Sequence, residues 1–426
     1  MKRKILLTSL VALVLLVGGL SAQDKNLSGT ITVLTHHTDM VDNLFQDYIK
    51  AFNAKYPNVK VELEGITDYA TTARTRMNTD DYGDVLMMIA NPPIPADFAK
   101  FYEPLGQKAT LEKTYKFLTP SSFNGVTYGI SPNANVAGGI LYNKQVFKDA
   151  GIKNPPKTID EFYADLKAIK TKFPDVAPLY MNYPSKWTLN AWEGNILTVA
   201  GDPDYLNKLA HMDDPFSPGK PLYTLYKVMY DVVKNKLCEN DPLTSDWELS
   251  KQMLADGKIG CMVLGSWAIS QVRALAKDPE NIGYMPFPYS IKGKIYAQVA
   301  PDYQEAINVH SKNKAAAKAW VDYMLDDSNF AVTTLSIPTK VGAKFPSVLD
   351  AFTNLGVIYI EAKDPPKAEE GLTDKIDKEA EIGLWNEPWK QRIVEAALGS
   401  SKETYDDIMK DLNAHWAKAR ASVGAK

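Results

Sequence analysis

The chain has 426 residues, of which 45% are hydrophobic and 23% are charged, and its formal net charge is -3. This length exceeds the usual size of a single domain, so we expect two domains or lobes. The small net charge and the lack of a basic run argue against a nucleic acid as the partner. Aromatic residues make up 10% of the chain, with 22 Tyr and 8 Trp, which fits either large cores or aromatic platforms in a binding cleft.

Residues 1–22 have the three-part pattern of a secretory signal peptide. Lys2, Arg3 and Lys4 precede an apolar stretch over 5–17, and small residues follow up to Ala22. The apolar stretch is shorter than the roughly 20 residues that a membrane-spanning helix needs. No cysteine follows it, so lipid attachment is not expected. We therefore predict cleavage after Ala22 and a soluble, exported protein located in the periplasm.

Two cysteines, Cys238 and Cys261, remain after export. In an oxidising compartment they can form a disulfide. Cys261 also belongs to an apolar run, where a small buried thiol is equally ordinary. The sequence leaves both readings open.

Strands and helices alternate in the first part of the chain. Residues 29–35 form a predicted strand, residues 59–65 alternate apolar with charged side chains, and residues 84–90 form an apolar run typical of a buried parallel strand. Between the first two lies a predicted helix, capped by Thr38 or Asp39, whose apolar positions are Val41, Leu44, Phe45, Tyr48, Ile49 and Phe52. This order implies a βαβ unit with a right-handed crossover.

The alternation continues to the C-terminus. Residues 138–151 have the pattern of a strand followed by a short helix, and Thr158 and Glu161 have the spacing of a capping box for the next helix. Further helices are expected from near Asn313 and over 389–419, with Ser400 and Glu403 spaced as a capping box for the last one. The expected fold class is α/β with parallel-type sheets.

Turn signals near 131–139 and 298–304 indicate that the chain leaves one lobe and later returns to it. We predict an N-terminal lobe of residues 27–135 plus 303–338. The C-terminal lobe would then contain residues 136–302 plus 339–426.

Most motifs of catalysis or cofactor binding are missing from the sequence. No phosphate-binding glycine loop follows a strand, and no HExxH, CxxC or GxSxG motif is present. His36 and His37 are adjacent, and neighbouring side chains at a strand end point to opposite faces, so we predict neither a metal site nor a cofactor. Paired carboxylates among the 51 acidic residues keep a glycosidase as the least favoured alternative.

Aromatic and amide side chains gather at predicted strand ends instead. The segments "WTLNAWEGN" (187–195), "GSWAIS" (265–270) and "LWNEPW" (384–389) carry tryptophans beside Asn and Glu. Trp267 lies between a buried strand and a helix, where we expect its ring to be half exposed. Ligand sites in open α/β sheets lie beyond the carboxyl ends of strands. A sugar stacks its C–H face on such rings and exchanges hydrogen bonds with the polar groups.

The sequence resembles the family 1 extracellular solute-binding proteins of bacterial sugar ABC transporters, and is similar to maltose-binding protein. The resemblance covers nearly the whole mature chain, and its most specific part is the ordered set "YGI…LYNKQVF…AGI…PPKTIDEF" followed by "GKIG…GSWA". It implies a two-lobe, class II binding-protein fold with a ligand cleft between lobes joined by hinge segments, closure on binding and no catalysis. It also implies a carbohydrate ligand, the permease subunits of an ABC importer as partner, and a monomer.

The resemblance assigns sugar stacking to Trp267 and polar contacts to the loops after the first and third strands. Relatives that bind maltodextrin have an acidic residue before the YNK stretch, where this chain reads "NANVAGG", so Asn133 and Asn135 stand in its place. The "DVLMMIANPP" stretch also lacks the Trp and Asp of those relatives, so the sugar stays open. The predicted ligand contacts are Trp267, His37, Thr38, Asp68, Asn91, Asn135, Trp187, Trp192, Glu193, Tyr303, Trp385 and Trp389.

A non-sugar solute is the second hypothesis. A polyamine would need several carboxylates around aromatic rings, for which Asp68, Glu193 and Glu387 are candidates. A glycerol phosphate ester would need an arginine cluster, and the predicted site loops carry few arginines.

Overall fold

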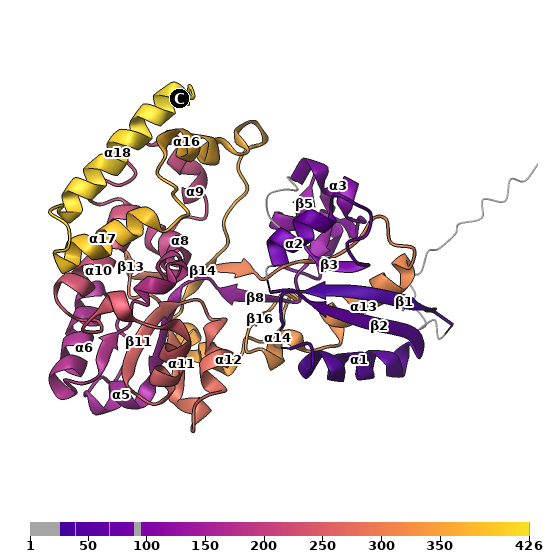
Figure 1. Cartoon of the computed structure of the whole chain (residues 1–426), viewed down its shortest axis with the longest axis horizontal. Helices are drawn as coiled ribbons and strands as arrows, with labels where there is room; N and C mark the ends of the chain where they lie inside the picture. The colour runs from indigo at the N-terminus through magenta and orange to yellow at the C-terminus, as the bar shows by residue number, and fades with distance from the viewer. Residues whose placement is uncertain (1–25, 39, 68, 89–94, 426) are drawn as a thin grey trace, which may run out of the picture.

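The computed structural model describes residues 26–38, 40–67, 69–88 and 95–425. The predicted signal peptide and two predicted contacts, Asp68 and Asn91, lie outside these residues. Figure 1 shows two lobes with a few strands between them. Among the described residues, no helix has both the length and the apolar character that crossing a membrane requires.

The first lobe is built on a five-stranded sheet with the order β2-β1-β3-β15-β7. Its strands are, in that order, Asn58–Gly65, Ser28–Thr35, Val85–Met87, Glu305–Ile307 and Gly129–Ile130. β1 pairs in parallel with β2 and β3, whereas β15 is antiparallel to both of its neighbours. A small antiparallel sheet, β4-β6-β5, consists of Gly106–Gln107, Val126–Thr127 and Ser122–Phe123.

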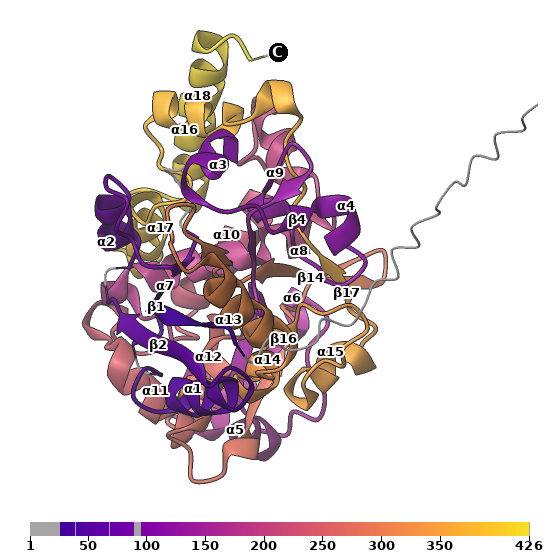
Figure 2. The same ribbon diagram turned by 90° about the vertical axis from the view of Figure 1, so that its right-hand side faces the viewer.

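Helices cover both faces of this sheet. Ile31 and Val33 of β1 share one core cluster with α1 and α13, and Leu34 shares a second with α2 and α3. Because successive strand residues point to opposite faces, Val33 and Leu34 of β1 can serve different clusters. Figure 2 shows α13 close to β1. The helices of the lobe are α1 Leu44–Lys55, α2 Tyr69–Arg76, α3 Phe98–Phe101, α4 Lys108–Leu111, α13 Lys314–Asp326 and α14 Phe330–Thr333.

Three strands run side by side between the lobes (Figure 1). β8 (Asn133–Val136) pairs antiparallel with β14 (Lys294–Pro301) on one side and with β16 (Ile337–Pro338) on the other. β14 also pairs with β13 (Ser290–Ile291) and β17 (Ile358–Ile360). These crossing strands lie beside the predicted lobe boundaries, whose residue limits stay a prediction.

The second lobe contains the sheet β10-β11-β9-β12, with strands Ala177–Leu179, Ile259–Leu264, Gly139–Asn143 and Ile282–Met285. All six residues of β11 are buried, as the apolar run predicts. Two core clusters cover its faces, one of them beneath α6, α10, α17 and α18. The helices are α5 Lys144–Asp149, α6 Ile159–Lys172, α7 Trp187–Asn190, α8 Ile196–Ala200, α9 Tyr205–Lys208, α10 Pro221–Lys234, α11 Trp247–Ala255, α12 Ala268–Arg273, α15 Asp350–Asn354, α16 Leu372–Ala380, α17 Pro388–Leu398 and α18 Tyr405–Ser422.

The fold class is confirmed, with three local corrections. Both main sheets are mixed rather than parallel, because β15 and β9 each run antiparallel to their neighbours. α1 begins later than predicted, with Asn43 as its N-cap. Thr404, not Ser400, caps α18, and the reciprocal box is completed by Asp407. Thr158 caps α6 as predicted.

Cys238 and Cys261 are free and buried. Leu179 of β10 pairs with Cys261 on one side and with Cys238 on the other. Two strand spacings of ~4.8 Å separate the cysteines, and their Cα atoms therefore lie beyond the ~7 Å limit for a disulfide. The structure excludes the disulfide reading in this conformation.

A reducing agent should therefore leave the melting temperature of the purified protein unchanged. Thermal unfolding with and without dithiothreitol checks this expectation. A drop of several degrees on reduction would contradict the placement of β10 between the two thiols.

Glu305 in β15 is buried, and within the described part of the chain its Oε2 atom has no hydrogen-bond partner. Burial raises the pKa of Glu305 to about 8. Between the ordinary carboxyl pKa of ~4.3 and this value, the folded protein holds a proton that the unfolded chain has lost. The free energy of unfolding should therefore fall as pH rises across that window.

Glu305→Gln should remove this part of the pH dependence, because an amide does not titrate. Thermal unfolding from about pH 5 to about pH 8 should show a smaller loss of stability for the variant than for the wild type. Parallel curves would contradict the buried, protonated state of Glu305.

Candidate functional site

A cavity of about 370 Å³ lies where the two lobes and the crossing strands meet. The first lobe contributes residues that follow β1 and residues around α14, and the second lobe contributes residues at the start of α12. The lining residues are His36, His37, Met40, Asn133, Asn135, Trp267, Ser270, Gln271, Asp302, Phe330, Thr334 and Ser336. Three predicted contacts, His37, Asn135 and Trp267, are therefore brought together.

Trp267 is half-buried, as the sequence predicts, and the turn before it explains how the ring is held. Ser266 and the crossing strand bond reciprocally: Ser266 N donates to Val136 O at 2.9 Å, and Val136 N donates to Ser266 Oγ at 3.0 Å. A Cβ at Gly265 would lie only 2.5 Å from the indole nitrogen of Trp267. Glycine is required there because the ring folds back against the backbone of residue 265.

Trp267 belongs to a cluster of three tryptophans at the second-lobe side of the site. The Trp187 ring centroid lies 5.7 Å from that of Trp267 and 4.9 Å from that of Trp247, and Trp247 lies 6.1 Å from Trp267. Trp187 is 37% exposed. The sequence analysis missed Trp247. The signal that could have found it is its position at the first residue of α11, directly after the capping residue Asp246.

One wall of the cavity brings two histidines of the first lobe against the carboxylate of Asp302, which follows the crossing strand β14. His36 Nε2 lies 4.0 Å from Asp302 Oδ1, and His37 Nε2 lies 3.9 Å from Asp302 Oδ2. The two imidazole centroids are only 3.8 Å apart. The expectation that these rings point to opposite faces is wrong, because β1 ends at Thr35 and both histidines lie in the turn beyond it.

Tyr303 lies beside this wall, and its ring centroid is 4.5 Å from that of His36, with the two rings tilted to each other. Thr38 is exposed and is not among the residues that line the cavity. On the crossing strand, Asn135 Oδ1 accepts a hydrogen bond from Ser266 Oγ at 3.3 Å, which links the polar floor of the cavity to the turn that holds Trp267.

Two predicted contacts are core residues instead. Trp192 and Trp389 are each only 2% exposed. The ring centroid of Trp192 lies 6.2 Å from that of Phe287, and the ring centroid of Trp389 lies 4.5 Å from that of Tyr226, both in edge-on arrangements. Neither indole presents a free face to a ligand, because both are packed within the core of the second lobe. Trp385 is half-buried against the same core.

Glu193 is engaged in an ion pair rather than in the cavity. The fully buried Lys390 ammonium donates to Glu193, and it also donates to Asn190 Oδ1 at 2.7 Å and to Asn386 O at 2.9 Å. Glu387 accepts a hydrogen bond from Asn190 Nδ2 at 2.8 Å. These contacts fasten the segments 187–195 and 384–389 to each other, which explains why both are rich in Asn and Glu.

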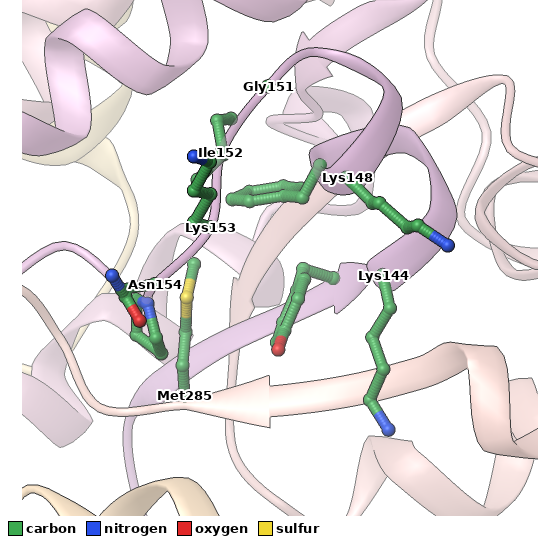
Figure 3. Close-up of a pocket in the computed structure, with 10 residues that line it drawn as sticks. Lys144, Lys148, Gly151, Ile152, Lys153, Asn154 and Met285 are labelled. Atoms are coloured by element: carbon green, nitrogen blue, oxygen red, sulfur yellow. The ribbon is translucent and has the colours of Figure 1, made fainter.

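A second cavity, of about 510 Å³, lies on the second lobe beside α5 (Figure 3). Lys144 and Lys148 extend away from Ile152 and Met285 in this view. Lys144 Nζ donates to Glu280 O at 2.7 Å. The charged side chains at this cavity are all lysines, and none of the predicted contacts lines it, so the interlobe cavity is the better candidate.

Two α/β lobes, three crossing strands and a polar and aromatic cavity between them define a two-lobe solute-binding protein. The family model of the bacterial extracellular solute-binding proteins matches residues 39–329. The chain belongs to this family.

Similar proteins with solved structures span nearly the whole chain. The ABC-transporter binding protein BlMnBP1 of Bifidobacterium animalis subsp. lactis, in complex with mannobiose, is 35% identical, with a TM-score of 0.84 over 93% of this chain and 96% of its own. The manno-oligosaccharide-specific BlMnBP2 of the same organism, in complex with mannotriose, is 34% identical, with a TM-score of 0.83 and the same coverage. The multiple sugar-binding protein of Streptococcus mutans is 27% identical over 316 residues, 71% of this chain and 73% of that protein.

Glu193→Ala should destabilise the second lobe strongly, because it leaves the buried Lys390 charge without its ionic partner. We expect a loss of about 3–5 kcal/mol in the free energy of unfolding, measured by denaturant titration. The partly exposed pair between Arg392, which lies on the same helix as Lys390, and Glu403 provides the control, since Glu403→Ala should cost less than ~1 kcal/mol. Equal effects would contradict the role of Lys390 as a buried clamp.

Proposed function

We propose that the protein binds a manno-oligosaccharide of two or three rings in the interlobe cavity and delivers it to an ABC importer, without converting it chemically. The observation that carries this proposal is the pairing of a half-exposed indole, Trp267, with polar groups from the opposite lobe across one cavity. The similarity to two mannoside complexes over nearly the whole chain supports the choice of sugar.

The cavity suits a pyranose ring on physical grounds. The indole of Trp267 offers a flat apolar surface to the C–H face of the sugar. Asn135, Gln271 and Asp302 offer amide and carboxylate groups that donate to or accept from hydroxyls in fixed directions. Because the groups come from both lobes, a sugar that contacts all of them favours the closed arrangement of the lobes.

The alternatives fit less well. The described residues that line the cavity include one carboxylate, Asp302, and no arginine. A polyamine would need several carboxylates, and Glu193 is already paired with Lys390. A glycerol phosphate ester would need arginine, and a glycosidase needs two carboxylates across one cleft.

The transport role has three further parts. We infer export to the periplasm from the signal-peptide pattern of residues 1–22. We place the lobe boundaries at 135/136, 302/303 and 338/339, where β8, β14 and β16 cross. The permease subunits would then recognise a monomer in its closed form.

Trp267→Ala should weaken the binding of mannotriose by about 10- to 100-fold, or ~1.4–2.8 kcal/mol, because the sugar loses its stacking surface. Isothermal titration calorimetry measures this loss. Trp267→Phe, which retains an aromatic face, should recover part of the affinity.

A matched control shows whether the effect is local. Trp385→Phe changes a half-buried tryptophan that is outside the residues lining the cavity, and it should leave the affinity unchanged. If wild-type protein gave no binding signal with mannobiose, mannotriose or a broad panel of other sugars, the proposed function would fail.

A further inference from the structure

The wall of the cavity that His36, His37 and Asp302 form has the donor set of a metal site. His36, His37 and Asp302 each offer one ligand atom, and these atoms all lie within 4.8 Å of one another. The two nitrogen–oxygen separations, 3.9 and 4.0 Å, are too long for hydrogen bonds but no longer than two metal–ligand bonds of ~2.0–2.2 Å placed end to end. Movements of less than ~1 Å by each side chain would bring the three atoms to the positions of a tetrahedron.

The surroundings orient these donors. His36 Nδ1 lies 2.8 Å from Met87 Sδ, so its Nε2 atom is the one that faces Asp302. Asp302 is held by a hydrogen bond from Tyr303 N to Oδ1 at 2.8 Å and by a contact from Asn133 Nδ2 to Oδ2 at 3.5 Å. Partners that fix the orientation of metal ligands in this way are a regular feature of metal sites.

We propose that His36, His37 and Asp302 bind a divalent transition-metal ion, with Zn²⁺ as the representative. Two imidazole nitrogens and one carboxylate suit a borderline cation rather than Ca²⁺ or Mg²⁺, which prefer sites made of oxygen ligands alone. Because the three donors come from one wall, the fourth coordination position faces the cavity, where a water molecule or a ligand hydroxyl can occupy it. The site goes beyond sugar binding, and its existence does not depend on which solute the cavity takes.

The test is a calorimetric titration of EDTA-treated protein with ZnCl₂. In a parallel titration with Co²⁺, the visible absorption of the bound ion is recorded. We expect one ion per chain and a Co²⁺ spectrum of tetrahedral intensity. His37→Gln and the isosteric Asp302→Asn should each weaken Zn²⁺ binding by more than ~10-fold. Circular dichroism of each variant shows that the fold is retained, and Asp302→Asn serves if His37→Gln does not fold.

His310 provides the matched control. Its Nε2 atom lies 3.4 Å from Asp80 in an exposed pair, which belongs to none of the candidate metal clusters among the described residues. His310→Gln should leave Zn²⁺ affinity unchanged.

Absence of saturable Zn²⁺ binding to the wild type would overturn the proposal. Equal affinity of the wild type, His37→Gln and Asp302→Asn would also overturn it. Titration of mannotriose in the presence of EDTA tests the proposed function separately, because loss of metal binding alone leaves the stacking surface of Trp267 in place.

Discussion

The reciprocal hydrogen bonds between Ser266 and Val136 are the constraint on which the binding site depends. They tie the end of β11, one of the two inner strands of the second-lobe sheet, to β8, one of the strands that cross between the lobes. The indole of Trp267 follows directly, so its position is set relative to the crossing strands rather than by the second lobe alone. Any change in the angle between the lobes therefore moves His36 and His37 of the first lobe relative to a fixed aromatic surface.

The sequence predicts those parts of the structure that depend on local pattern. The buried strand β11, the strand β2 and the capped helix α6 each follow from short-range periodicity or from a capping residue. Trp267 could be placed because a strand, two small residues and a helix start surround it. Chain length and turn signals predicted two lobes, whereas the ligand cleft between them came from the resemblance to sugar-binding proteins.

The failures arise where tertiary contacts decide the outcome. Trp192 lies five residues from Trp187, yet one indole is in the core and the other is exposed, because the segment turns through two short helices between them. Lys390 carries no sequence signal as the partner of Glu193, since almost 200 residues of chain separate them. Asp302 reaches His36 and His37 only through the return of the chain along β14.

The indole of Trp267 from the second lobe and the two histidines His36 and His37 from the first lobe thus line one cavity. The account requires that a bound sugar bridge them and bring the lobes together. Small-angle X-ray scattering with and without mannotriose tests this requirement directly. We expect a smaller radius of gyration with saturating sugar for the wild type, and Trp267→Ala should need about 10- to 100-fold more sugar to reach the same decrease. Tight binding with an unchanged radius of gyration in the wild type would contradict it.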